Sequence, residues 1–285
     1  MITWLNTPIE MQFRTIDGLS IRFAESPDRN DHALLLSPWP ESLLAFEPTW
    51  SRLAADTHLV AIDLPGFGHS QRRDALLSPR AMGEFVIQVA DSFGLETPHL
   101  VGPDIGTAAS LFAAALYPGR LRSLVVGGGA TAYPLEVGRL LKDLIEAPEL
   151  EEYRSSDPRQ LVADTLTGLE RCVLPDAVRE DYISSYDGDR LVESMRYVRA
   201  YPTELPVLRE LLPWIQTPVQ IIAGTRDAMV PPVNAEFLHQ RLPQSKLDLL
   251  DTGHFVWEDA ADEYAALITD WWGGGYRTAR SATAR

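Results

Sequence analysis

Gly102-Pro103-Asp104-Ile105-Gly106 joins an apolar run at 98–101 to an alanine-rich run at 108–116. The pattern predicts a strand, a sharp turn and a helix, because glycines two residues before and two residues after Asp104 let strand and helix pass closely without a Cβ clash. This is the form of a nucleophile elbow, G-x-S-x-G, with aspartate in place of the central serine. We therefore expect the side chain of Asp104 to project from the carboxyl edge of a sheet.

Short apolar runs alternate with helical patterns on both sides of this turn. A hairpin of two antiparallel strands is predicted within 9–23, around Asp17-Gly18. Further strands are predicted at 33–36, 59–62, 99–102, 121–126, 219–223 and 247–250, and helices at 41–55, 79–93, 108–116, 233–242 and 257–272. Such alternation predicts an α/β fold in which a mostly parallel sheet carries helices on both faces.

The pattern changes in the middle of the chain. From 131 to about 213 strand-like runs stop, and amphipathic stretches at 135–145, 158–169 and 189–201 replace them. We expect a helical cap domain, 131–213, inserted into a core domain made of 1–130 and 214–273. The tail at 274–285 is rich in glycine, serine and arginine and is expected to be disordered.

Composition narrows the class of partner. The 285 residues carry a formal net charge of −15 without a run of lysine or arginine, which argues against nucleic acid and anionic membranes and leaves a small neutral molecule as substrate. Cys172 is the only cysteine, so no internal disulfide forms. Residues 1–14 lack a basic start followed by an apolar core, so a cytoplasmic location is expected. The sequence does not decide the oligomeric state, and a homodimer is one of the options.

Three residues with the chemistry of a catalytic triad each follow a predicted strand. In chain order they are Asp104, Asp227 and His254, a nucleophile, an orienting acid and a base, and the carboxyl ends of parallel strands meet at one sheet edge. Asp251 and Glu258 compete with Asp227 for the role of orienting acid, although surface charge or helix capping suits them better. Asp104 itself has one alternative role, as a cap of the following helix.

Four motifs carry a resemblance that covers about 9–272. They are the elbow at 102–106, the turn Asp63-x-Pro65-Gly66-x-Gly68-x-Ser70, the segment Gly224-Thr225-Arg226-Asp227, and Gly253-His254-Phe255. With them the chain resembles an α/β-hydrolase, in the branch of epoxide hydrolases and haloalkane dehalogenases that use an aspartate nucleophile. The resemblance implies an eight-stranded, mostly parallel sheet with an inserted helical cap, and catalysis without cofactor or metal.

An aspartate nucleophile selects substrates with a leaving group on saturated carbon. Attack by a carboxylate on such a carbon gives an alkyl ester of the enzyme, which water then cleaves at its carbonyl. His254 would activate that water while Asp227 steadies the imidazolium. Backbone N–H groups of Ile105 and Trp39 are the predicted oxyanion hole. Trp39 lies in Ser37-Pro38-Trp39-Pro40, where the resembling family usually has His-Gly-x-Pro, and it is also a candidate wall of the substrate pocket.

Epoxides and alkyl halides both satisfy this chemistry, so the residues around the elbow must separate them. Resembling dehalogenases place a tryptophan or an arginine just after the nucleophile, where this chain has Ile105. Resembling epoxide hydrolases use two cap tyrosines, whose phenols stay protonated at neutral pH and can donate to the epoxide oxygen. Spacing favours Tyr153 and Tyr197 for this role, and Tyr201 is a reserve that also serves as a substrate-binding candidate. The full set of cap tyrosines is Tyr133, Tyr153, Tyr182, Tyr186, Tyr197 and Tyr201.

The sequence thus predicts a hydrolase that opens a neutral, largely apolar epoxide to a vicinal diol. Two alternatives remain: a haloalkane dehalogenase with an atypical halide site, and a non-catalytic ligand sensor built on the same scaffold. The sequence offers no account of Pro103, which removes a backbone N–H from the end of a central strand.

Overall fold

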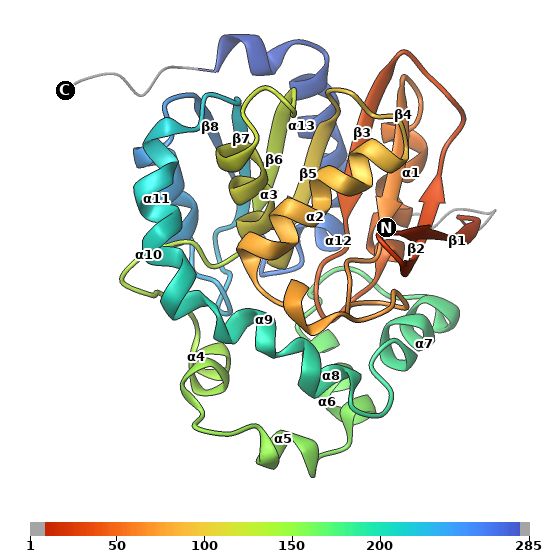
Figure 1. Cartoon of the computed structure of the whole chain (residues 1–285), viewed down its shortest axis with the longest axis vertical. Coiled ribbons are helices and arrows are strands. Elements are labelled where there is room, and N and C mark those ends of the chain that lie inside the picture. Colours follow the sequence, from red (N-terminus) through yellow and green to blue (C-terminus); the bar gives the residue numbers. More distant parts are fainter. Residues whose placement is uncertain (1–8, 280–285) are drawn as a thin grey trace.

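The computed structural model describes residues 9–279, and an eight-stranded sheet in the order β1-β2-β4-β3-β5-β6-β7-β8 forms its centre (Figure 1). The two pairs β1–β2 and β2–β4 are antiparallel, and all others are parallel. The predicted α/β-hydrolase fold is therefore confirmed. The strands are β1 (Met11–Ile16), β2 (Leu19–Glu25), β3 (Asp31–Leu36), β4 (Thr57–Ile62), β5 (His99–Pro103), β6 (Ser123–Gly127), β7 (Val219–Gly224) and β8 (Ser245–Leu250).

The first hairpin forms because two residues accept left-handed backbone angles. Asp17 and Gly18 have φ of 48° and 75°, as a two-residue turn with positive φ at both central positions requires. In four strands inside the sheet alternation of burial is lost: all residues of β4, β5, β6 and β7 are buried. Continuous burial is expected of strands that helices cover on both faces.

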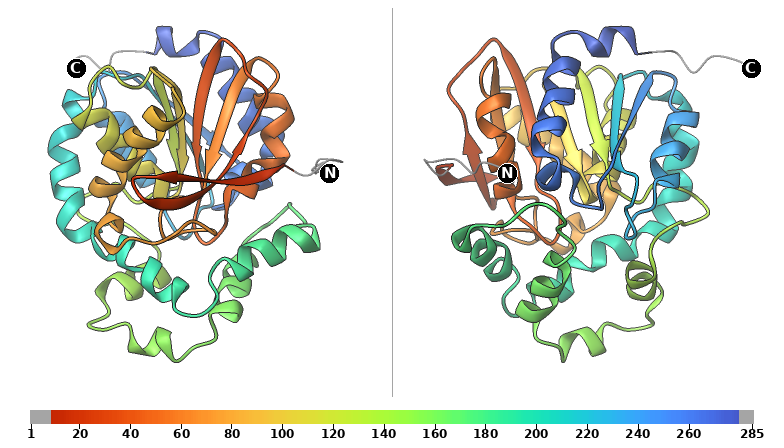
Figure 2. Two further views of the ribbon diagram at one scale, coloured as in Figure 1. Left: turned by 45° about the vertical axis from the view of Figure 1, so that its right-hand side comes forward. Right: turned by 180° about the vertical axis from the view of Figure 1, so that it is seen from behind.

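Helices α2 (Pro79–Ser92) and α3 (Ile105–Leu116) pack together on one face of the sheet, and α1 (Glu47–Leu53) and α13 (Ala261–Trp272) pack together on the other (Figure 2). The chain runs from β3 through α1 to β4, and then through α2 back across β3 to β5. The direction of winding therefore reverses between β3 and β5. In open α/β sheets the crevice at such a switch point, outside the carboxyl ends of the strands, is where ligands bind.

The inserted cap lies along that carboxyl edge, below the sheet in Figure 1. Between β6 and β7 the chain is helical and contains no strand, and every backbone position there is described. The last cap helix returns to the core and contacts α2 and α3. The cap helices are α4 (Arg139–Glu146), α5 (Glu151–Arg154), α6 (Pro158–Leu166), α7 (Asp176–Ser184), α8 (Arg190–Ser194), α9 (Arg196–Arg199) and α10 (Tyr201–Leu211).

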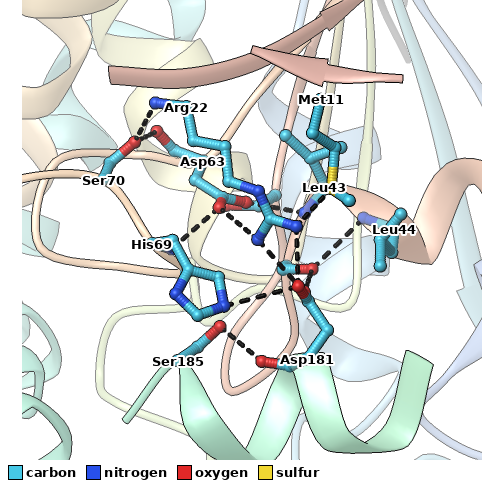
Figure 3. Close-up of polar contacts among 12 residues, drawn as sticks. Met11, Arg22, Leu43, Leu44, Asp63, His69, Ser70, Asp181 and Ser185 are labelled. Carbon is cyan, nitrogen blue, oxygen red and sulfur yellow. Dashed lines mark hydrogen bonds and ion pairs between the residues drawn. The ribbon is translucent and has the colours of Figure 1, made fainter. Parts of the chain in front are cut away.

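A buried ionic cluster ties the cap to the core (Figure 3). Asp181 of α7 accepts hydrogen bonds from the Arg22 guanidinium at 2.6 and 3.2 Å and from the Ser42 hydroxyl at 2.6 Å. Arg22 also pairs with Asp63 at 3.3 Å, and His69 lies 3.4 Å from Asp181. Although burial opposes ionisation, contacts with His69 and Arg22 lower the pKa of Asp181 to about 2. The cap is thus fixed to the core by charge.

The C-terminal segment differs from the sequence prediction in two ways. The predicted helix at 257–272 is interrupted at Ala260, whose φ of −126° separates α12 (Val256–Asp259) from α13. The tail predicted to be disordered begins with a 3-10 helix, η4 (Gly275–Thr278), because Tyr276 packs against the rings of His99 and Trp271. Residues 280–285 of that tail lie outside the described residues. None of the helices within 9–279 is long and apolar enough to cross a bilayer.

Candidate active site

Asp104 occupies a strained turn between β5 and α3. Its φ of 50° and ψ of −123° are rarely adopted by a residue with a Cβ, and such strain persists only where the surroundings enforce it. A Cβ on Gly102 would lie 2.2 Å from the Ser110 hydroxyl and 2.6 Å from the Gly106 carbonyl oxygen. A Cβ on Gly106 would lie 3.3 Å from Leu36 of β3. The elbow therefore has the predicted shape: close contacts require glycine at 102, and a side chain at 106 would press on Leu36.

The structure also accounts for Pro103. The Asp104 amide donates to Gly127 of β6 at 2.9 Å. Successive backbone amides along a strand face opposite edges, so the nitrogen of Pro103 faces β3. The last pair between β3 and β5 is Leu35 with Val101, so β3 has left the ladder there. Proline costs no ladder hydrogen bond at this position.

His254 lies between the two predicted aspartates. Its Nδ1 is 2.8 Å from Oδ2 of Asp227, and its Nε2 is 3.7 Å from Oδ1 of Asp104. The other oxygen of Asp227 accepts from the amides of Met229 and Val230 at 2.9 and 2.8 Å, which fixes the carboxylate. All three triad side chains are buried. The structure thus brings the predicted nucleophile, base and orienting acid together.

The alternative acids have other partners. Asp251 is an exposed residue paired with Arg226, and Glu258 accepts a hydrogen bond from the Tyr182 hydroxyl at 2.9 Å. Neither replaces Asp227 at Nδ1 of His254. The orienting acid that sequence order favoured is therefore the one in contact.

The charge on His254 depends on its neighbours. Burial alone lowers the pKa of an imidazole, but the carboxylates of Asp227 and Asp104 outweigh it and raise the pKa of His254 to about 10. The resting site thus holds an imidazolium between two carboxylates. Covalent attachment of a substrate to Asp104 would neutralise one of them and lower the pKa of His254 toward the range of a general base.

One of the two predicted oxyanion donors contacts Asp104. The Trp39 amide, on the loop after β3, donates to Oδ2 of Asp104 at 2.8 Å. Ile105 is the first residue of α3, and the amides of a first helical turn have no acceptor within their own helix. The Trp39 indole donates to the Ser194 hydroxyl of α8 at 2.9 Å, so this N–H is already engaged with the cap.

A cavity of about 550 Å³ opens above Asp104, between the carboxyl edge and the cap. Asp104, His254 and Trp39 line its core side. Its cap side is largely apolar and includes Leu140, Leu144, Leu161, Val162, Met195 and Val198. An apolar chamber over a few convergent polar groups is typical of a site for a small, mostly apolar ligand.

The tyrosines divide differently from the prediction. Tyr153 of α5 and Tyr201 of α10 line the cavity, and the negative charge of Asp104 adds to burial in raising the pKa of Tyr201 well above its usual value. No hydrogen-bond partner for the Tyr201 hydroxyl is found within 9–279. Tyr197 is not among the described cavity-lining residues, and its hydroxyl donates to the Ile105 carbonyl at 2.8 Å. The structure therefore places Tyr201, the reserve candidate, at the cavity, and it does not place Tyr197, which the spacing favoured, among the described lining residues.

A buried pair of carboxyl groups behind the site was missed by sequence reasoning. Glu41 accepts from the Trp257 indole at 3.0 Å, and that indole ring lies edge-on to His254 with centroids 5.6 Å apart. Burial and the neighbouring Glu258 raise the pKa of Glu41 well above its usual range, and burial raises that of Glu258 to about 7. The sequence signal that could have indicated this pair is the position of the two glutamates: Glu41 is two residues after Trp39, and Glu258 is four residues after His254.

Comparisons with known proteins agree with this architecture. The family model described as alpha/beta hydrolase fold matches residues 34–261. A pimeloyl-[acyl-carrier protein] methyl ester esterase from Neisseria meningitidis is 26% identical over 88% of this chain and 96% of its own length. Human serine hydrolase BPHL is 25% identical over 90% of this chain and 84% of its own. The crystal structure of epoxide hydrolase VrEH1 from Vigna radiata superimposes with a TM-score of 0.77 and 15% identity, covering 93% of this chain and 98% of that one.

Proposed function

The chain belongs to the alpha/beta hydrolase fold family and is a hydrolase, and from this premise we propose that it opens neutral, largely apolar epoxides to vicinal diols. The observation that carries the proposal is the carboxylate of Asp104, rather than a hydroxyl, at the strained centre of the elbow and at the floor of an apolar cavity. A carboxylate in this position suits displacement at saturated carbon.

The two oxygens of Asp104 have different surroundings, and this assigns their roles. Oδ2 accepts from the Trp39 amide, so it is the oxygen held as the carbonyl of an ester. Oδ1, which faces His254 at 3.7 Å, attacks a ring carbon of the epoxide. As the new C–O bond forms, the ring C–O bond breaks, and its electron pair goes to the epoxide oxygen.

The epoxide oxygen needs a proton as the ring opens. Tyr201 and Tyr153 line the cavity and supply phenolic donors from two cap helices. We assign the proton to Tyr201, because its hydroxyl has no other described partner. It also lies close enough to Asp104 for that negative charge to add to burial in raising its pKa. The resulting hydroxyalkyl ester carries no charge on Asp104.

Hydrolysis of the ester follows from that loss of charge. His254, now beside a single carboxylate, gives its proton to the Tyr201 phenolate, which restores the phenol. The neutral imidazole then accepts a proton from water, which attacks the ester carbonyl carbon. The amides of Trp39 and Ile105 donate to the oxyanion of the tetrahedral intermediate. Collapse breaks the bond between the carbonyl carbon and the diol oxygen, and the imidazolium gives its proton to that oxygen, which completes the diol. The carboxylic acid left on Asp104 then gives its proton to His254, which restores the carboxylate and the resting imidazolium.

Two further activities compete for this site. The relative named as a methyl ester esterase favours ester hydrolysis, which a carboxylate nucleophile would carry out through an anhydride on Asp104. Alkyl halides fit the same first step, but Ile105 has no polar hydrogen in its side chain and the Trp39 indole is engaged by Ser194. A leaving halide therefore lacks a side-chain donor in either place.

A turnover screen separates these reactions. We expect diol from terminal, cyclic or aryl epoxides, no halide from 1-chloro- or 1-bromoalkanes, and at most slow cleavage of p-nitrophenyl esters. Asp104→Ala removes the nucleophile and should abolish diol formation while leaving the cavity open. Halide or ester turnover without diol would overturn the proposal. If nothing is turned over but a small ligand raises the melting temperature, a non-catalytic sensor is supported instead.

A further inference from the structure

Three side chains with metal-ligand chemistry meet at the amino ends of β3 and β4. These strand ends lie at the sheet edge opposite the cap (Figure 1). They are Asp28, His32 and His58, and one ligand atom from each lies within 4.8 Å of the others. The catalytic residues follow the carboxyl ends of their strands, so this cluster has no part in the chemistry proposed for Asp104 and His254.

Strand register brings the two imidazoles together. His32 and His58 are paired residues of the parallel strands β3 and β4, and paired residues of neighbouring parallel strands project from the same face of a sheet. Their ring centroids lie 5.4 Å apart with the planes at 85°. Asp28 reaches them from the loop between β2 and β3.

A fourth residue orients one of these rings. Glu25, the last residue of β2, places Oε1 3.0 Å from Nε2 of His58. When the Nε2–H group donates a hydrogen bond to this carboxylate, Nδ1 carries the free lone pair that can bind a metal ion. Metal-bound histidines commonly have their second nitrogen bonded to a carboxylate in this way, which fixes the tautomer and makes the ligand more basic.

The cluster is open to solvent on one side. His58 is buried, His32 is half-buried and Asp28 is exposed. Tetrahedral zinc with bonds of about 2.0–2.2 Å places its ligand atoms about 3.4 Å apart, so the three groups need only a small inward movement. An exposed aspartate can supply that movement by changing rotamer, and water can fill the fourth position.

We propose that Asp28, His32 and His58 bind a divalent late transition metal ion, with Zn²⁺ as the natural occupant and Glu25 as a positioning residue for His58. Two imidazole nitrogens favour Zn²⁺ over Ca²⁺ and Mg²⁺, which take oxygen ligands. The ion would tie the loop at 26–30 to the starts of two strands.

The test uses the full chain without a histidine tag, treated with a chelator and then dialysed. Titration with ZnCl₂ against a chromogenic zinc chelator should give one site per chain, and Zn²⁺ should raise the melting temperature. CaCl₂ and MgCl₂ should leave it unchanged. Glu25→Gln should weaken zinc affinity about 10- to 100-fold.

Variants of the ligands decide the proposal. Asp28→Ala and His32→Ala should each weaken zinc binding at least about 10-fold, while His239→Ala, which removes a histidine bonded to Ser245 elsewhere, should have no effect. Because His58 is buried, the exposed Asp28 gives the cleaner result. The rate of epoxide opening should be the same for Asp28→Ala and the wild type. No zinc binding up to millimolar concentration, or equal binding by Asp28→Ala, His32→Ala and the wild type, would overturn the proposal.

Discussion

Replacing Asp181 by asparagine should loosen the attachment of the cap. The substitution keeps the size of the side chain but removes the negative charge that lies 2.6 Å from the Arg22 guanidinium. The side chain of Arg22 is only 5% exposed, and Asp63 is then its remaining anionic partner. The folded-state pKa of Asp181 is about 2, against 3.8 for an unperturbed aspartate. At about 1.4 kcal/mol per pKa unit, the ionised form stabilises the folded protein by about 2 kcal/mol.

The sign of the pH dependence follows from that direction. Because the folded pKa lies below the unfolded one, the stabilisation is complete above about pH 4 and is lost as the pH falls through about 2. Urea unfolding at pH 7 should show Asp181→Asn destabilised by about 2 kcal/mol, and the difference from wild type should shrink between pH 4 and pH 2.

Asp189 provides the matched control for this measurement. It also joins the cap to the core, through Arg72 at 3.2 Å, but its side chain is 62% exposed. Exposed pairs contribute little, so Asp189→Asn should change stability by less than about 0.5 kcal/mol. Equal effects of the two substitutions, or a constant difference between Asp181→Asn and wild type down to pH 2, would refute the reasoning.

Three further outcomes follow from contacts in and behind the site. Tyr201→Phe should lower kcat for epoxides about 100-fold through loss of the general acid, whereas Tyr197→Phe should have a smaller effect on kcat, as steady-state kinetics will show. Gly102→Ala should destabilise the protein by about 3 kcal/mol or more in urea unfolding, because its Cβ meets backbone atoms that cannot move aside. Burial raises the pKa of Glu258 from 4.5 to about 7, so the stability that is present below pH 4.5 is lost as the pH rises through about 7. The melting temperature of the wild type should therefore decline over this range, and Glu258→Gln should make the decline smaller. An equal decline in the variant would count against a titrating Glu258.

The order of strands and helices was predictable because each element carries its own local pattern. The elbow, the hairpin at Asp17-Gly18 and the Ser78 cap of α2, which accepts from the Ala81 amide at 3.4 Å, depend on glycines or on short-range hydrogen bonds. Asp227 and His254 were found for a related reason, since residues that follow parallel strands share one edge.

Contacts between distant segments were not predictable from these patterns. Tyr197 and Tyr201 are four residues apart, but they lie on α9 and at the start of α10, and only tertiary packing decides which hydroxyl faces the cavity. The carboxyl pair of Glu41 and Glu258 joins segments more than 200 residues apart in the chain. Acidic side chains are usually at the surface, so a buried pair is recognised only when both partners are placed.

The covalent ester on Asp104 is the central claim, and intact-protein mass tests it most directly. His254→Gln, mixed with an epoxide that the wild type converts to diol, should gain the mass of one epoxide, and peptide mapping should place it on Asp104. The double variant Asp104→Ala/His254→Gln should gain nothing. An unmodified His254→Gln protein beside an active wild type would contradict the two-step account.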